Sequence, residues 1–288
     1  MSSSDTRSKR EKEFRLWLKQ EIPKFPNDKT TLQIFEKMTT TDQIIAYMNW
    51  RARYVTQRPR SVTIEKTVSL DPRWQALSPN INSLLSKVKA GVDLTPHLST
   101  DIRYGFTPPA TARVHDADAW ADKDLILNVM GFHHFHLGRI MVNGHIDRTN
   151  EVLFAFVSRD DFEVLGIFNH DVFKTNSPNP MAVERKRLWN LYEDRLARRA
   201  APGSLLVGSG IALSGHALPV VQAALRCVKR IRQLDSKLNQ SAYIQNLYKS
   251  LNLPAPAKAT LLWRLWHLDF GLFAPKENQF LTLEKWPN

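Results

Sequence analysis

The residues most able to do chemistry in this 288-residue chain are histidines that gather in one short stretch. His133, His134 and His136 lie within four residues of one another, and His145 and His170 follow. Five of the nine histidines therefore fall within 38 residues. Imidazole is the side chain whose ordinary pKa lies nearest to neutrality, so it exchanges protons at physiological pH. The cluster indicates acid–base catalysis, a metal site or a polar structural strand.

Acid–base cleavage of a phosphodiester is the first of these interpretations. It needs one imidazole to take a proton, another to donate one, and a cation to stabilise the charge that develops on the phosphate. The acid and base candidates are His134, His136 and His170. The cationic candidates are Arg139 and Arg148, which follow the first histidines in the sequence. This chemistry requires no metal ion and no organic cofactor.

A metal site and a structural strand are the other two interpretations. His134 and His136, joined by His170, Asp147 or Asp171, would supply the imidazole and carboxylate donors that zinc and manganese accept. In the third interpretation the imidazoles only form ordinary hydrogen bonds within a polar strand. The residue types and their spacing leave all three interpretations open.

The residues around the cluster have the composition of β-strands. Apolar runs separated by turn residues predict an antiparallel hairpin or meander over 124–173. The run 151–157 is apolar on both faces, which predicts a central strand covered by helices. Because side chains alternate along a strand, His134 and His136 should project to one face and His133 to the other.

The same alternation assigns a face to the last of these histidines. It places His170 on one face with Phe162, Val164 and Phe168. An antiparallel neighbour could then bring His170 within reach of the strand at 133–136.

Charge is the most informative property of the whole chain. Forty Lys and Arg against 28 Asp and Glu give a net charge of +12 and a pI near 9.9. Such a balance favours polyanionic partners, because phosphate contacts release counterions and steer association. Residues 1–66 carry a net +6 and residues 181–232 a net +7, whereas residues 115–171 carry a net −6. Two basic regions thus flank an acidic centre.

Arginines of the two basic regions are the candidates for phosphate contacts. Between Trp50 and Arg60, aromatic side chains that can stack on bases alternate with positive charges. The candidate nucleic-acid-binding residues are Arg51, Arg53, Arg58, Arg60, Arg185, Arg187, Arg226 and Arg230. The alternative is that these residues form solvated faces of helices and meet no ligand.

Composition excludes several classes of protein. The 43% hydrophobic and 24% charged content is that of an ordinary globular chain. No apolar run approaches the ~20 residues of a membrane-spanning helix, and the first residues lack the apolar core of a signal peptide. The single cysteine, Cys227, excludes an internal disulfide and a cysteine-based zinc site. We therefore predict a soluble, cytoplasmic protein that has no contact with membranes.

Helical patterns flank the β-rich centre on both sides. Apolar residues recur at helical spacing over 9–22, 32–54 and 217–239. We therefore predict an α+β fold, in which a central, mostly antiparallel sheet is packed by N- and C-terminal helices. The predicted regions are a mainly helical basic region at 1–110, a β-rich catalytic core at 111–178, and a helical region at 179–288.

The order of features in 133–170 resembles the catalytic sheet of the RelE/HigB/YoeB-type toxin ribonucleases, within the barnase–EndoU–colicin–RelE group. His136-Leu137 would match the first strand, Arg148 the residue after a loop, Glu151–Val157 the hydrophobic strand, and Val164–His170 the strand that ends in a histidine. The resemblance covers about 40 of the 288 residues. Members of that family are much shorter and more basic in the sheet, so the flanking regions would be additions.

This resemblance implies a metal-independent endoribonuclease that acts on RNA in preference to DNA. It also implies a role as a toxin or phage-defence effector, with an antitoxin or another protein as a partner. Two other functions fit the residues themselves. One is a non-catalytic nucleic-acid-binding or adaptor protein, and the other is a metal-dependent nuclease or phosphohydrolase.

Overall fold

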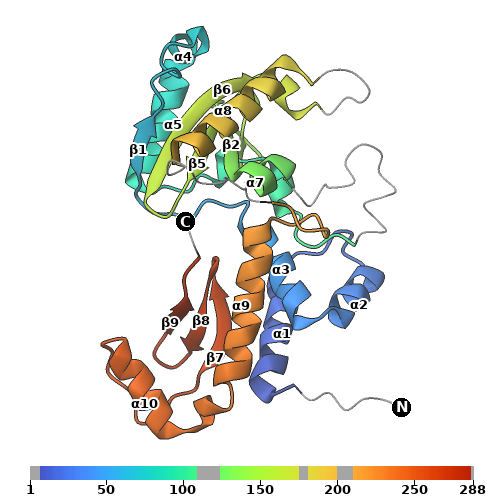
Figure 1. The fold of residues 1–288 in the computed structure, drawn as a ribbon, viewed down its shortest axis with the longest axis vertical. Helices are drawn as coiled ribbons and strands as arrows, with labels where there is room; N and C mark the ends of the chain where they lie inside the picture. The colour runs from blue at the N-terminus through green and yellow to red at the C-terminus, as the bar shows by residue number, and fades with distance from the viewer. Residues whose placement is uncertain (1–6, 109–123, 175–180, 200–209, 287–288) are drawn as a thin grey trace. The chain divides into compact units, whose positions relative to one another are not determined.

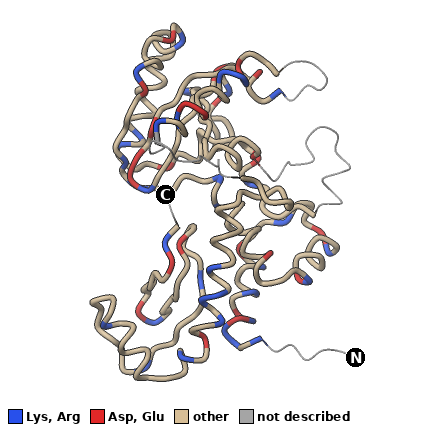
Figure 2. Tube along the Cα trace, in the orientation of Figure 1, with Lys and Arg blue, Asp and Glu red and all other residues tan. Residues whose placement is uncertain are grey.

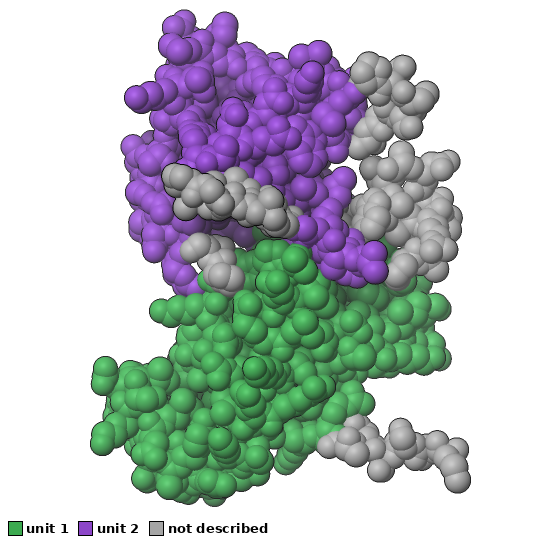
Figure 3. Space-filling view, in the orientation of Figure 1, with its two compact units in different colours: residues 1–52, 104–122, 218–287 green, residues 53–103, 123–217, 288 purple. Residues whose placement is uncertain are grey.

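The computed structural model describes residues 7–108, 124–174, 181–199 and 210–286 (Figure 1). The chain divides into two compact units, each built from segments that are distant in the sequence (Figure 3). The described residues of unit 1 are 7–52, 104–108 and 218–286, and those of unit 2 are 53–103, 124–174, 181–199 and 210–217. The two ends of the chain thus contribute to one unit, which differs from the predicted division into three consecutive regions.

Unit 1 combines terminal helices with a small antiparallel sheet. Its principal elements are α1 (Lys9–Glu21), α2 (Lys29–Lys37), α3 (Thr40–Arg51), α9 (Leu218–Leu234), α10 (Ser241–Ser250), β7 (Leu262–Trp266), β8 (Asp269–Ala274) and β9 (Gln279–Glu284). The three strands pair in the order β7-β8-β9. Helices α1 and α3 contact each other, α1 contacts β7, and α3 contacts α9. The buried apolar side chains at these contacts tie the two ends of the chain together.

The helix predicted over 32–54 is divided into α2 and α3. Asp28 caps α2 by accepting a hydrogen bond from the Thr31 N–H, and Thr39 caps α3 by accepting one from the Asp42 N–H. The extended backbone at Thr39 therefore ends one helix and begins the next. Nine of the twelve residues of α3 are buried, so this helix forms the centre of unit 1.

The C-terminal region is not wholly helical, in contrast to the prediction for 179–288. Short runs of alternating apolar residues form β7, β8 and β9 between 262 and 284. His267 and Asn278 adopt positive φ angles of 54° and 48° in the two hairpin turns. On α9 the buried side chains include Ala224, Cys227, Val228 and Ile231, whereas Leu218 and Leu225, which the helical pattern placed on the apolar stripe, are exposed.

Unit 2 is built around a four-stranded sheet with the strand order β1-β6-β5-β2. Its elements are β1 (Ser61–Ile64), α4 (Pro72–Ala76), α5 (Ser78–Ala90), η1 (Thr95–His97), η2 (Thr100–Arg103), α7 (Leu125–Met130), β2 (Phe132–His136), β3 (Met141–Val142), β4 (His145–Ile146), β5 (Glu151–Val157), β6 (Asp161–Asn169), η3 (His170–Phe173) and α8 (Val183–Arg199). Strands β2, β5 and β6 pair antiparallel, and β1 pairs with β6 in parallel. The prediction of β5 as a central strand is confirmed.

Helices cover both faces of this sheet (Figure 1). On one face, apolar side chains of α5 pack with Phe135, Leu153 and Phe162. On the other face, side chains of α7 and α8 pack with Phe132 and Phe154. Two apolar layers therefore hold the strands, and the predicted α+β class is confirmed. The helices on this sheet are internal ones, because the terminal helices α1 and α9 belong to unit 1.

A β-bulge in β6 changes the predicted faces of that strand. The register with β5 shifts between Phe154 and Ala155, so that Leu165 is an extra residue. Before the bulge, Val164 faces the α5 side of the sheet, and after it Phe168 faces the α7 and α8 side. The prediction that Phe162, Val164 and Phe168 share one face is therefore wrong. The bulge directs the end of β6 toward the face that carries His134.

No helix in the described part of the chain has the length and the apolar content that crossing a membrane would require.

Candidate active site in unit 2

Three of the predicted catalytic histidines lie side by side on the α7 and α8 face of the sheet. His134 and His136 project from β2, and their ring centroids are 6.0 Å apart. His170 begins η3 directly after β6, and its ring stacks against that of His136 at 5.9 Å and an angle of 24°. His133 projects to the other face, as the alternation along a strand predicts. The sequence pattern thus anticipated which histidines would meet.

His134 is held by an aspartate at the start of the preceding helix. Asp124 caps α7 by accepting a hydrogen bond from the Leu127 N–H at 2.9 Å. Its second carboxylate oxygen, Oδ2, lies 3.6 Å from His134 Nδ1. The ring also contacts Phe173 at a centroid distance of 4.9 Å, and the side chain is 14% exposed. His134 therefore combines an apolar surrounding with one fixed negative charge and limited access to solvent.

His136 is the most enclosed of the three. It is 5% exposed, and its Nδ1 atom has no hydrogen-bond partner among the described residues. Its backbone carbonyl accepts a hydrogen bond from His97 Nδ1, at 2.9 Å. Burial, together with the charges of His134 and Arg148, lowers the pKa of His136 to about 3. This ring therefore stays neutral at physiological pH and is unsuited to donating a proton.

His170 has a defined tautomer and faces solvent. Its Nδ1 atom lies 2.7 Å from the Asn150 carbonyl oxygen, so Nδ1 must carry the proton that is donated. In the neutral ring, Nε2 is then the atom with a free lone pair. The stacked ring of His136 and the contact with Phe173 fix its plane. His170 is therefore placed to accept a proton at Nε2.

The two predicted arginines occupy different surroundings. Arg148 is exposed, donates to Thr100 Oγ1 at 3.0 Å, and lies near enough for its charge to lower the pKa of His134 and His136. Arg139 is exposed at the start of the loop that carries β3 and β4, where its backbone N–H donates to Asp147 Oδ1 at 2.7 Å. Arg148 is therefore the arginine that the fold brings into electrostatic range of the imidazoles.

Burial and nearby charges also shift the pKa of His134. Burial is the largest cause that lowers the pKa of His134, and the charges of His170 and Arg148 lower it further. The charge of Asp124 acts in the opposite direction and stabilises the protonated ring. Negative charge bound beside Arg148 would offset that arginine and raise the pKa of His134 again.

The carboxylates of the predicted metal site are engaged elsewhere. Asp147 accepts hydrogen bonds from backbone N–H groups of its own loop, and Asp171 forms an ion pair with Lys174 at 2.6 Å. Within the ranges that the structure describes, no group of three or more His, Cys, Asp or Glu side chains is placed to hold a metal ion.

Searches of protein-family models, curated proteins and solved structures found no match to this chain.

Two arginines predicted to bind nucleic acid are buried instead. Arg53 and Arg60 are each 6% exposed. The guanidinium of Arg60 donates to the carbonyls of Thr56 and Ser158 at 2.8 and 2.9 Å. Arg53 donates to the Asp101 carbonyl at 3.2 Å. These hydrogen bonds to backbone oxygens join distant loops, and both guanidiniums are largely withdrawn from the surface where a phosphate would bind.

The other predicted arginines divide between structural and surface positions. Arg187 forms ion pairs with Asp71 and Glu184 and lies 4.1 Å over the Phe168 ring, so it holds α8 against the sheet. The remaining ones lie near the surface or line a pocket of unit 1: Arg51, Arg58, Arg185, Arg226 and Arg230. Of these, Arg58 pairs with Asp160 at 3.6 Å and Arg230 pairs with Glu284.

Alanine in place of Arg60 is expected to destabilise the protein by about 1 to 3 kcal/mol, because it leaves partly buried carbonyl groups without a donor. Arg58→Ala is the matched control, since its pair with Asp160 is exposed and an exposed pair contributes about 0 to 1 kcal/mol. Urea denaturation of the two variants measures both values. Equal, small losses of stability would show that the Arg60 hydrogen bonds do not hold the loops.

Asp124 is the site residue that the sequence analysis missed. The signal was present, because an aspartate directly before an apolar run is typical of a helix N-cap. The β-rich pattern predicted over 124–173 begins instead with a helix, because 125–130 form α7, and Gly131, with a φ of 73°, ends that helix. The short helix turns the chain so that its cap lies beside His134.

Proposed function

We propose that unit 2 is a metal-independent ribonuclease, with His170 as general base, His134 as general acid and Arg148 as the phosphate-binding cation. The observation that supports this assignment is the convergence of β2, the end of β6 and the loop before β5. Two imidazoles with access to solvent and one arginine meet there within electrostatic range. Acid–base cleavage of a phosphodiester requires this set of groups.

The tautomer of His170 suits the first half of the reaction. With Nδ1–H donated to the Asn150 carbonyl, Nε2 can accept the proton of a ribose 2′-hydroxyl. The 2′-oxygen then attacks the adjacent phosphorus and forms the P–O bond of a 2′,3′-cyclic phosphate. DNA lacks the 2′-hydroxyl, so this reaction selects RNA.

His134 and its aspartate suit the second half. The bond between phosphorus and the 5′-oxygen breaks as the protonated His134 donates its proton to that oxygen, which leaves as a 5′-hydroxyl. Asp124 stabilises the charged ring before the transfer. A phosphodiester bound at Arg148 offsets the charge that otherwise lowers the pKa of His134. His136 touches no reacting atom in this scheme and positions the ring of His170 by stacking.

The cellular role follows from the resemblance to RelE-type toxins alone. On that ground we propose a toxin or phage-defence effector with an antitoxin or other protein partner. We propose the cytoplasm as its place of action, since RNA is the substrate and the single cysteine, Cys227, is buried and offers no disulfide.

Incubation of the protein with end-labelled single-stranded RNA, single-stranded DNA and duplex DNA, with and without EDTA, tests the assignment. We expect cleavage of RNA alone, with 2′,3′-cyclic phosphate ends and no loss of rate in EDTA. EDTA-sensitive cleavage would contradict it in favour of a metal-dependent nuclease. Binding with every substrate left intact would contradict it in favour of a non-catalytic nucleic-acid-binding protein, which the net charge by itself also supports.

A further inference from the structure

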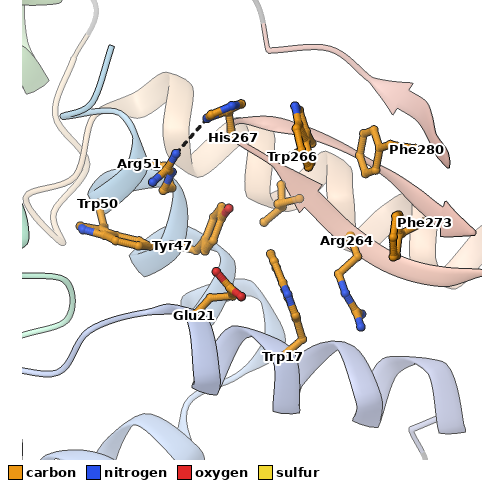
Figure 4. Close-up of a pocket in the computed structure, with 11 residues that line it drawn as sticks. Trp17, Glu21, Tyr47, Trp50, Arg51, Arg264, Trp266, His267, Phe273 and Phe280 are labelled. Atoms are coloured by element: carbon orange, nitrogen blue, oxygen red, sulfur yellow. Dashed lines mark hydrogen bonds between the residues drawn. The ribbon is translucent and has the colours of Figure 1, made fainter. Parts of the chain in front are cut away.

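Unit 1 contains a pocket that is lined by aromatic rings and has no part in the histidine site. Its volume is about 330 Å³. Trp17 of α1 and Tyr47 and Trp50 of α3 form one wall, and Trp266 of β7 and Phe280 of β9 belong to the other (Figure 4). Aromatic rings therefore line this open pocket from two sides.

The rings are held in place by their neighbours. Trp17 and Tyr47 lie 5.3 Å apart, and Tyr47 contacts Trp50 edge-on at 5.9 Å. On the strand side, Trp266 lies 6.4 Å from Phe280 and is 62% exposed. Figure 4 shows these two groups on opposite sides of the pocket. A large exposed indole in a structured hairpin contributes little to folding, and it offers a π-face to a ligand.

Charged groups lie among the rings. Arg51 lies 5.2 Å over the Trp50 ring and contacts His267 Nδ1 at 2.8 Å. Arg264 lies 5.2 Å over the Trp17 ring. Glu21 also lines the pocket and offers carboxylate oxygens, which act only as acceptors. The guanidinium of Arg264 is also paired with Glu13. The pocket can therefore meet a planar ring with its walls, N–H donors with Glu21, and an anion with Arg51.

The unit around the pocket carries most of the net charge of the chain. The described residues of unit 1 include 20 Lys and Arg against 10 Asp and Glu, a net of +10, compared with +12 for the whole chain. Many of the positive residues lie along α1 and α9 (Figure 2). A single-stranded nucleic acid is the polyanion that also presents planar rings, because its unpaired bases are open to stacking.

We propose that this pocket binds an unpaired nucleobase of single-stranded RNA, which stacks on Trp266, while an adjacent phosphate meets Arg51. The pocket volume is at the low end of the roughly 300–1,000 Å³ that ligand sites span, which suits one base rather than a longer segment. The choice of RNA rests on the proposed function, whereas the stacking of a base does not. The pocket thus binds the RNA substrate and takes no part in cleavage of the phosphodiester bond.

Binding of two labelled 8-nucleotide RNAs, one ordinary and one abasic, tests this proposal at a single low salt concentration. The protein carries His170→Ala, so that it cannot cleave the RNA under the proposed mechanism. We expect ordinary RNA to bind roughly 5- to 100-fold more tightly than abasic RNA, since stacking on an aromatic side chain supplies the difference. Trp266→Ala should remove most of this difference, and Trp266→Phe should retain most of it.

Leu225→Ala is the matched control, because Leu225 is an exposed apolar residue of the same unit outside the pocket. It should leave both affinities unchanged. Equal binding of the ordinary and abasic RNAs, or a Trp266→Ala protein that still prefers the ordinary RNA, would overturn the proposal. If cleavage by the unmodified protein fails while the preference for bases persists, the ribonuclease proposal falls and the pocket remains. If the preference for ordinary over abasic RNA is lost while cleavage by the unmodified protein persists, the pocket proposal falls and the ribonuclease proposal remains.

Discussion

Alanine in place of His170 is expected to lower the rate of RNA cleavage by about 10²- to 10⁴-fold, the range that general acid–base catalysis contributes. The same loss is expected for His134→Ala, because the proton transfer to His170 and the proton transfer from His134 belong to the same cleavage reaction. Arg148→Ala should cost about 10²- to 10³-fold through lost stabilisation of the phosphate charge. Single-turnover cleavage of a labelled RNA measures each rate.

Two comparisons separate this catalytic role from a structural one. His216→Ala serves as the control histidine, since His216 lies in unit 2 outside the cluster and bonds to Ser214 Oγ at 3.0 Å. It should retain the full rate of cleavage. His170→Ala should retain its thermal stability, because the ring lies near the surface and its one hydrogen bond is to the Asn150 carbonyl. A stable His170→Ala protein that cleaves at the full rate would refute the assignment.

The pH dependence of cleavage follows from the lowered pKa of His134. An acid catalyst must be protonated, and burial, the largest cause, lowers the pKa of His134, so that its protonation requires a lower pH than usual. The rate should therefore fall as the pH rises, with an optimum on the acid side of the ordinary histidine pKa of 6.5. Substituting Asp124 by Asn should move this optimum further toward acid, since the charge of Asp124 raises the pKa.

The second large effect is a loss of stability in acid that originates from His136. The unfolded chain binds a proton near the ordinary pKa of 6.5, whereas the folded ring does so only near a pKa of about 3. Between these values the proton favours the unfolded state, so stability is full above about pH 6.5 and declines as the pH falls. His136 should account for a loss of about 2.5 kcal/mol between pH 7 and pH 4.5, given about 1.4 kcal/mol per pKa unit.

Urea denaturation of the protein and of His136→Gln at both pH values isolates this contribution. Glutamine keeps a polar side chain of similar length but does not titrate, so the variant should lose about 2.5 kcal/mol less than the parent. The comparison holds even if glutamine lowers stability at pH 7, because only the change with pH is compared. Equal losses in the two proteins would show that His136 is not held neutral by the fold.

Local patterns in the chain determined much of what the structure contains. Alternation along the strand predicted that His134 and His136 would share a face and that His133 would not. The apolar run at 151–157 predicted the central strand, and the apolar spacing predicted α1 and α9 within a few residues. These are properties of one element and its nearest neighbours, so they can be deduced from sequence periodicity.

Other features depended on contacts that no local pattern encodes. Arg53 and Arg60 have the same sequence surroundings as Arg58, yet two of the three are buried because distant loops close over them. The aromatic pocket joins rings from 17–50 to rings from 266–280, and only the packing of the two chain ends in one unit brings them together. Burial is set by the tertiary structure, and composition by itself cannot predict it.

The histidine site combines features that the sequence determined with one that only the tertiary structure determined. The residue types and the antiparallel order of the strands came from the sequence, and with them the prediction that His170 could come within reach of the strand at 133–136. The face on which His170 lies was decided by the bulge at Leu165, which shifts the alternation of β6 by one residue. Because a shift of one residue reverses every side chain that follows, register is a property of the folded sheet and not of the strand.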